Sequence, residues 1–241
     1  MSMKKLELYV HIPFCEEKCR YCDFLSFRAD EGEKKAYVTQ LIEEIKAQGQ
    51  NYSEYLVSSI FIGGGTPTTL SGIWILDIMN AIRENFMVET DAEVSIECNP
   101  GTLSTSKIMH IKKAGVNRIS FGLQSSIEEE LKELGRIHTY KDFLQSYQLA
   151  REYGFTNINV DLMSGLPKQT IDSYKTTLKR VCALKPEHIS AYSLIIEPGT
   201  PFFEKYGSEE GSQLLPGENT DREMYALTKS ILKEHGYERY E

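Results

Sequence analysis

Three cysteines near the N-terminus have the spacing of metal ligands. Cys15, Cys19 and Cys22 stand within eight residues as C-x3-C-x2-C. A structural zinc site needs four ligands, usually from two spaced pairs, and the chain has no second C-x2-C or H-x3-H pair. Iron–sulfur clusters are held by cysteine thiolates, normally four of them. Three cysteines therefore predict a [4Fe–4S] cluster with one iron open for chemistry.

The remaining cysteines and histidines offer no competing site. A disulfide within the triplet would leave an odd cysteine and does not suit a cytoplasmic protein. Cys98 and Cys182 fit no ligand spacing, and we expect both to be buried core thiols. Zinc and disulfide bonding remain the minor alternatives for the triplet. The scattered histidines are expected to be surface or hydrogen-bonded polar residues, and His138 is the least certain; they are His110, His138, His188 and His235.

Short β-branched or aromatic runs alternate six times with segments of helical spacing. Val38, Leu41, Ile42 and Ile45, for example, fall on one face of a helix. Such alternation predicts a parallel sheet with right-handed crossovers. The predicted strands are 6–12, 57–62, 92–97, 117–121, 157–163 and 188–194. Glycines are expected to end helices at Gly49, Gly115, Gly154 and Gly236.

The strand pattern favours a barrel over a doubly wound open sheet. Strands covered on both faces are nearly continuous apolar runs. Here Val94 and Ile96 alternate with Ser95 and Glu97, so one face of the strand is polar. A polar face turned to the interior indicates a lined cavity with a ligand. We predict a partial (β/α)6 TIM-like barrel that forms a single domain over residues 1–241, with a loop at 197–219.

Residues with functional chemistry follow the predicted strands. The triplet follows the first strand, and the run Gly63–Thr66 follows the second. Glu97, Gln124 and Asp161 lie at or near the ends of the third, fourth and fifth. Barrels of this class build their active sites at the carboxyl ends of their strands. These residues are therefore expected to share one site.

Composition limits the partners. The net charge of −8 argues against a nucleic-acid ligand. No apolar run is long enough to span a membrane, and the first residues lack the apolar core of a signal peptide. We expect a cytoplasmic protein without a transmembrane segment.

The triplet, with Tyr21 before its last cysteine, resembles the signature of the radical S-adenosylmethionine (SAM) superfamily. That resemblance implies that SAM binds the open iron and is cleaved to methionine and a 5′-deoxyadenosyl radical after the cluster passes it an electron. Further segments resemble the oxygen-independent coproporphyrinogen III oxidase family, which includes the HemW branch of heme chaperones. These segments are 9–15, 61–68, 95–100, 120–124, 135–138 and 161–170.

The resemblance also implies roles for single residues. Tyr9, Gly64 and Glu97 match contacts to the cluster-bound SAM. A second SAM site is implied by matches at Tyr21, Gly65, Thr66, Gln124, Arg136, Asp161 and Ile195. A carboxylate can bind ribose hydroxyls or an ammonium group, and an arginine can bind a carboxylate bidentately. No residue is assigned a catalytic role.

Two departures from the oxidase pattern bear on function. The oxidases carry a further cysteine two residues after the triplet, where this chain has Phe24, as the heme chaperones do. The family also continues into a C-terminal domain, which we expect to be missing here. The first hypothesis is a porphyrinogen oxidase, and the second, which Phe24 favours, is a heme-binding and transfer protein. A radical enzyme with an unrelated substrate is the third. The implied partners are heme or a porphyrinogen, an electron donor for the cluster and a heme acceptor protein.

Overall fold

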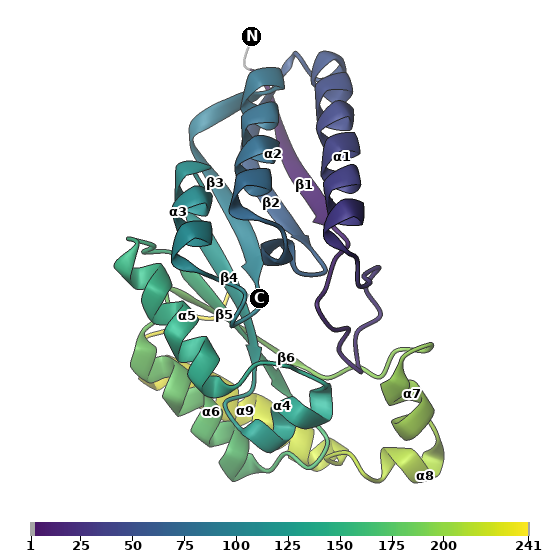
Figure 1. The fold of residues 1–241 in the computed structure, drawn as a ribbon. Coiled ribbons are helices and arrows are strands. Elements are labelled where there is room, and N and C mark those ends of the chain that lie inside the picture. Colours follow the sequence, from purple (N-terminus) through teal and green to yellow (C-terminus); the bar gives the residue numbers. More distant parts are fainter. Residues whose placement is uncertain (1–2, 241) are drawn as a thin grey trace. The chain divides into compact units, whose positions relative to one another are not determined.

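The computed structural model describes residues 3–240, in which strands and helices alternate along the chain (Figure 1). The strands are β1 (Lys4–Ile12), β2 (Tyr55–Gly64), β3 (Met87–Cys98), β4 (Arg118–Gln124), β5 (Ile158–Ser164) and β6 (His188–Ser193). The helices are α1 (Glu31–Asn51), the short 3-10 helix η1 (Pro67–Thr69), α2 (Gly72–Asn85), α3 (Thr105–Lys113), α4 (Glu128–Leu134), α5 (Tyr140–Glu152), α6 (Ile171–Leu184), α7 (Pro201–Tyr206), α8 (Glu209–Ser212) and α9 (Glu218–Glu234).

The strands form one sheet in the order in which they occur along the chain. The pairs β1–β2, β2–β3 and β5–β6 are parallel, as expected for strands joined by helical crossovers. This order confirms the predicted α/β class with six strand–helix repeats. None of the helices within residues 3–240 is both long and apolar enough to cross a membrane.

The chain divides into two compact units that interleave in sequence. The first unit comprises residues 1–16, 25–120 and 146–156, and the second comprises 17–24, 121–145 and 157–241. The boundaries cut the cysteine loop twice, so Cys15 belongs to the first unit and Cys19 and Cys22 to the second. The prediction of one domain over the whole chain stays a prediction.

In the first unit, helices α1, α2 and α3 lie over one face of strands β1 to β3 (Figure 1). Val10, Ile62 and Ile96 are paired in register across these strands, and all three are buried. Their neighbours along the strands, such as Tyr9, Phe61 and Ser95, project to the other face because side chains alternate along a strand. The first unit therefore has the apolar face that the alternation predicts, while its other face carries aromatic as well as polar side chains.

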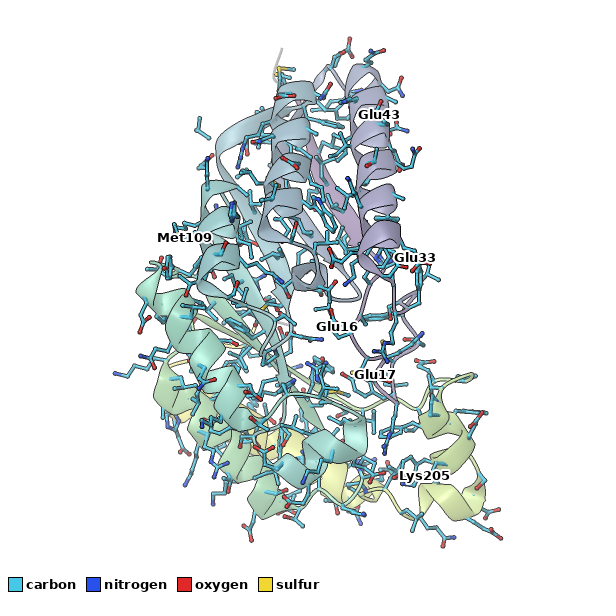
Figure 2. All side chains as sticks on the ribbon, in the orientation of Figure 1. Glu16, Glu17, Glu33, Glu43, Met109 and Lys205 are labelled. Atoms are coloured by element: carbon cyan, nitrogen blue, oxygen red, sulfur yellow. The ribbon has the colours of Figure 1, made fainter. Side chains whose placement is uncertain are left out.

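Helix α1 begins directly after the cysteine loop at a capping box. The Asp30 side chain accepts from the Glu33 N–H at 2.8 Å, and the Glu33 carboxylate accepts from the Asp30 N–H at 2.9 Å. Figure 2 shows Glu33 at this end of α1 and Glu43 farther along it. The prediction that α1 ends at Gly49 is wrong, because the helix continues to Asn51. A Cβ on Gly49 would lie 2.5 Å from the Asn85 carbonyl oxygen, so this glycine permits close packing of α1 on the end of α2.

The second unit has its own apolar core. Helices α6 and α9 are neighbours, joined by a 2.8 Å hydrogen bond between the hydroxyls of Tyr174 and Thr228. A separate cluster of buried residues joins the end of α4 to β5, its following loop and α7; its members are Leu134, Met163, Leu166, Phe202 and Tyr206. Lys205, labelled in Figure 2, and Tyr206 both donate to Glu133 next to this cluster.

The segment 197–219 is not the unbroken loop that its composition predicts. It contains α7 and α8, which begin at side-chain caps from Thr200 and Ser208. Pro201 at the first position of α7 is also favourable, because the missing N–H would have no helical partner there. The Gly, Ser and Pro residues that indicated a loop thus serve as the ends of two short helices.

Candidate functional site

The glycine run, whose first two residues are the last of β2, holds the chain around Cys15 in place. Gly65 N–H donates to the Ile12 carbonyl at 2.9 Å, and Thr66 N–H donates to the Phe14 carbonyl at 2.7 Å. On the other side, Cys15 N–H donates to the Phe27 carbonyl at 3.0 Å. The backbone of Cys15 is therefore fixed between the glycine run and the returning end of the cysteine loop.

The hydroxyl of Thr66 lies beside the Cys15 sulfur. Thr66 is buried, and its Oγ1 is 3.5 Å from Cys15 Sγ. The same oxygen accepts a hydrogen bond from Asn99 Nδ2 at 2.8 Å. Thr66, expected at a second SAM site, is thus placed against a cysteine of the triplet. Asn99, which the sequence did not single out, is its partner.

Asn99 is held by the turn that follows β3. The sequence Asn99-Pro100-Gly101-Thr102 has proline and glycine at the positions that a type II turn prefers. Thr102 N–H donates to the Asn99 carbonyl at 3.2 Å, and Gly101 has a φ of 84°. This turn motif is the sequence signal that could have drawn attention to Asn99.

Tyr9, Gly64 and Glu97 lie together in the first unit, as the resemblance implies. Gly64 N–H donates to Glu97 Oε2 at 2.9 Å. Partial burial and then the negative charge of Glu97 raise the pKa of Tyr9. The Tyr9 ring stacks on Phe61 with a centroid distance of 6.1 Å. The three residues thus present a carboxylate, a backbone amide and a phenol hydroxyl within the first unit.

Gly64 and Gly65 of the first unit leave no room for a side chain at their positions. Gly64 has a φ of 116°, and a Cβ there would lie 2.6 Å from the ring of His11. A Cβ on Gly65 would lie 2.7 Å from the Phe14 carbonyl oxygen and 3.0 Å from Cys15 Sγ. Gly65 therefore adds no side chain of its own next to the Cys15 sulfur, where the Thr66 hydroxyl lies.

Charged neighbours also support this segment. Lys34 of α1 is buried and comes within 3.5 Å of Glu16 Oε1, next to Cys15 in the sequence. Figure 2 shows Glu16 on the loop that leads away from β1. The ion pair connects the loop to the first turns of α1.

In the second unit, the turn that carries Cys19 and Cys22 is anchored through Arg20. Arg20 N–H donates to the Leu134 carbonyl at 3.0 Å, and the Arg20 carbonyl accepts from Phe202 N–H at 2.9 Å. Cys22 N–H donates to the Cys19 carbonyl at 3.2 Å, which closes the turn. The turn is therefore fixed between the end of α4 and the start of α7.

Arg136 contacts the Cys19 sulfur. Its Nη1 donates to Cys19 Sγ at 3.4 Å, and its Nη2 donates to the Gly122 carbonyl. Burial acts to lower the pKa of Arg136, but the negative charge that Cys19 and Tyr21 can carry outweighs it and raises that pKa. The guanidinium is thus a fixed positive charge that donates a hydrogen bond to the Cys19 sulfur.

Tyr21 and Gln124 belong to the same unit. Tyr21 packs against the buried cluster around Phe202, and burial raises the pKa of its hydroxyl well above the usual value. Gln124 is buried at the end of β4 with a φ of 69°, in the left-handed region that non-glycine residues rarely adopt. Its side-chain oxygen accepts from the Tyr192 hydroxyl at 3.0 Å. Such strain is typical of functional sites.

Asp161 and Ile195 are less closely tied to these groups. Asp161 lies in the middle of β5, three residues before its end, and not near the end as predicted. Its Oδ1 accepts from Asn159 Nδ2 at 2.7 Å. Ile195 follows β6, and 67% of it is exposed.

His138 differs from the other histidines. It is buried, and its Nε2 has no hydrogen-bond partner within residues 3–240. Burial and then the nearby charge of Arg136 lower its pKa to about 3, against a hydrogen bond to the Leu123 backbone that raises it. The other three follow the prediction: His110 and His235 bond carbonyls one helical turn back, and His188 bonds Asn159 and Tyr240.

The residues present fit an iron–sulfur cluster in their chemistry. All five cysteines are thiols, and the triplet is partly exposed while Cys98 and Cys182 are buried, as predicted for these two. A hydroxyl faces Cys15 and a guanidinium faces Cys19, and both are groups that can donate a hydrogen bond to a ligating sulfur. Within residues 3–240, no group of three His, Cys, Asp or Glu side chains is gathered that could hold a metal ion. The joint binding of one cluster by the triplet stays a prediction.

The radical SAM superfamily profile matches residues 9–181, which include the triplet, the glycine run and Glu97. The chain belongs to the radical SAM superfamily. Two similar curated proteins are the heme chaperones HemW of Bacillus subtilis, 39% identical over 97% of this chain, and of Escherichia coli, 38% identical over all of it. The chain spans 61% and 62% of the lengths of these two relatives.

A solved structure confirms the fold class. Coproporphyrinogen III oxidase (HemN) from Escherichia coli, described as a radical SAM enzyme, matches with a TM-score of 0.87 and 32% identity. The match covers 98% of this chain and 54% of that one. The predicted partial barrel of the radical SAM kind is therefore confirmed.

Proposed function

We propose that Cys15, Cys19 and Cys22 hold a [4Fe–4S] cluster that binds SAM at its open iron. The spacing of the three thiols and the donors set against Cys15 and Cys19 support this proposal. When bound, the cluster supplies an electron to SAM. An external electron donor must then reduce the cluster. The proposal includes a cytoplasmic location, where thiols stay reduced.

In this proposal the first unit provides the contacts to the cluster-bound SAM. Glu97 accepts hydrogen bonds from an ammonium group or from hydroxyls, and Gly64 offers its backbone amide next to that carboxylate. Tyr9 places an aromatic ring and a hydroxyl beside them.

The family resemblance implies a second SAM site, and we carry it over to the matching residues Gly65, Thr66, Tyr21, Gln124, Asp161 and Ile195. Arg136 is the matching cation, but its guanidinium already donates to Cys19 and to the Gly122 carbonyl. A second ligand would have to share these donors. We therefore assign Arg136 first to the Cys19 sulfur.

The function that we propose for the protein is that of a heme chaperone, which binds heme and transfers it to an acceptor protein. The observation that carries it is Phe24, a residue 61% exposed that stands where the oxidases have a further cysteine. The HemW proteins among the similar sequences support the same assignment.

A heme titration of the protein that carries this chain, run in parallel with an assay of protoporphyrinogen formation from coproporphyrinogen III, tests this function. The chaperone function predicts saturable heme binding and no turnover, with or without SAM. Turnover without heme binding would contradict it.

The alternative is oxygen-independent coproporphyrinogen III oxidase, which converts two propionates to vinyl groups. The observation that favours it is the similarity to the HemN structure over nearly the whole chain. The parallel assay separates the two, because the oxidase must consume SAM in proportion to the porphyrinogen it decarboxylates. If a Phe24→Cys variant gains no turnover, residues other than Phe24 must account for the difference between chaperone and oxidase.

A further inference from the structure

The hydrogen-bond chain from Asn99 through Thr66 to Cys15 has one direction when Cys15 is a thiolate, which can only accept. Asn99 Nδ2 can only donate, so it occupies a lone pair of Thr66 Oγ1 over 2.8 Å. The hydroxyl has a single proton, and the other group within hydrogen-bonding distance of Thr66 Oγ1 in residues 3–240 is Cys15 Sγ, at 3.5 Å. Thr66 is 2% exposed, so water does not compete for that proton. The Thr66 proton is therefore directed at the sulfur of a ligating Cys15 thiolate.

The backbone fixes both ends of this chain. Thr66 is held through its own N–H to the Phe14 carbonyl, one residue before Cys15. Asn99 is held by the turn that Pro100 and Gly101 form, which uses its carbonyl and leaves its side-chain amide for Thr66. The hydroxyl is thus positioned before any ligand binds.

We propose that Asn99 is a positioning residue that directs the Thr66 hydroxyl onto the Cys15 thiolate and so raises the reduction potential of the cluster. This inference rests on the proposed cluster ligation. Hydrogen bonds to the sulfurs are among the factors that set the potentials of iron–sulfur clusters. A donated proton stabilises the added negative charge of the reduced cluster, which makes reduction easier.

The test is the midpoint potential of the reconstituted cluster, followed by electron paramagnetic resonance during a redox titration. Thr66→Val removes the donor, and Asn99→Ala releases the hydroxyl to rotate; both move the potential to more negative values. Asn99→Asp moves it farther than Asn99→Ala, because the carboxylate accepts the Thr66 proton and draws it away from the sulfur. Thr66→Ser retains the hydroxyl and is therefore expected to keep the wild-type potential.

Two further variants exclude a merely structural effect. Thr69→Val makes the same change of side chain three residues away, at a buried hydroxyl that has no hydrogen-bond partner among residues 3–240, and must leave the potential unchanged. The double variant Thr66→Val/Asn99→Ala must match Thr66→Val alone, since Asn99 acts through the hydroxyl. Equal potentials in wild type, Thr66→Val and Asn99→Asp would overturn the inference.

A metal-free measurement separates this inference from the proposed function. In the apo protein, the rate of Cys15 alkylation by iodoacetamide is followed by peptide mass spectrometry. Thr66→Val and Asn99→Asp are expected to slow it about threefold, because the thiolate loses its donor. If the wild type binds no cluster but these rates differ, the cluster proposal fails and the positioning role stands. Equal rates together with equal potentials reject the positioning role while the cluster stands.

Discussion

Arg136 Nη1 donates to Cys19 Sγ at 3.4 Å, although the two residues are 117 positions apart in the sequence. Its other nitrogen donates to the Gly122 carbonyl, so the guanidinium joins the cysteine turn to β4. The cation that family resemblance assigned to a ligand carboxylate therefore already has a role within the protein. It holds and polarises one thiol of the triplet.

Removing the Arg136 guanidinium should lower both the folding stability and the iron content of the reconstituted protein. Arg136→Ala leaves the Gly122 carbonyl without its donor, and we expect a loss of about 2 kcal/mol in the free energy of unfolding. Arg136→Lys keeps the charge but not the forked geometry, so its stability and iron content should lie between those of wild type and Arg136→Ala. Chemical denaturation and iron content after reconstitution measure these effects. Wild-type stability and iron content in both variants would refute this role.

Folding stability should fall between pH 6.5 and pH 3 because of His138. Burial and the Arg136 charge lower the pKa of His138 to about 3 in the folded protein, whereas the unfolded chain has a value of about 6.5. Between these values only the unfolded chain binds the proton, so acid favours unfolding. At pH 5 the His138 contribution is a loss of about 2 kcal/mol relative to pH 7.

The variant His138→Asn isolates this contribution. Asparagine keeps an N–H donor for the Leu123 backbone but does not titrate. Urea denaturation at pH 7 and pH 5 should show that the variant loses about 2 kcal/mol less than wild type on acidification. Parallel losses in the two proteins would show that His138 is not the titrating group.

Two neighbouring threonines should respond in opposite ways to the same substitution. Thr68 Oγ1 is 2.6 Å from Thr102 Oγ1, whereas the buried Thr69 Oγ1 has no hydrogen-bond partner within residues 3–240. Thr68→Val should destabilise the protein by about 1 kcal/mol, and Thr69→Val should be neutral or stabilising. The melting temperatures of the two variants, measured by thermal denaturation, test this prediction. A larger loss for Thr69→Val than for Thr68→Val would contradict the hydrogen-bond assignment.

Gly64 should be far less tolerant of alanine than Gly199. Both have positive φ values, 116° and 83°, but a Cβ on Gly64 would meet the His11 ring while one on Gly199 would meet nothing within 4 Å. Gly199→Ala should therefore cost only backbone strain, about 1 kcal/mol. Gly64→Ala should cost more and also disturb the amide that donates to Glu97. Equal melting temperatures for the two variants would disprove this difference.

The sheet could be predicted from the sequence because its signals are local. Alternation such as Val94–Glu97 and runs such as Leu6–Ile12 give the strand ends to within three residues, except that β3 begins at Met87, five residues before the predicted start. The prediction of a helix end at Gly49 failed because the small size of this glycine permits the contact with Asn85 and does not mark a helix end. The caps at Thr200 and Ser208 form helices too short for periodicity to reveal.

The candidate site could be predicted only where one segment carries it. The triplet and the glycine run are contiguous motifs. The contacts of Thr66 with Asn99, and of Arg136 with Cys19, join residues 33 and 117 positions apart, and no local pattern encodes them. The missing partner of His138 Nε2 is likewise a property of packing and not of spacing.

The most direct test of the central claim is the iron and sulfide content of anaerobically reconstituted single-cysteine variants. Wild type should hold about four irons and four sulfides per chain. Cys15→Ala, Cys19→Ala and Cys22→Ala should each lose the cluster. Cys98→Ala should keep it, because that thiol is buried, with a pKa raised to about 11 by burial. Equal cluster content in all four variants would contradict the assignment.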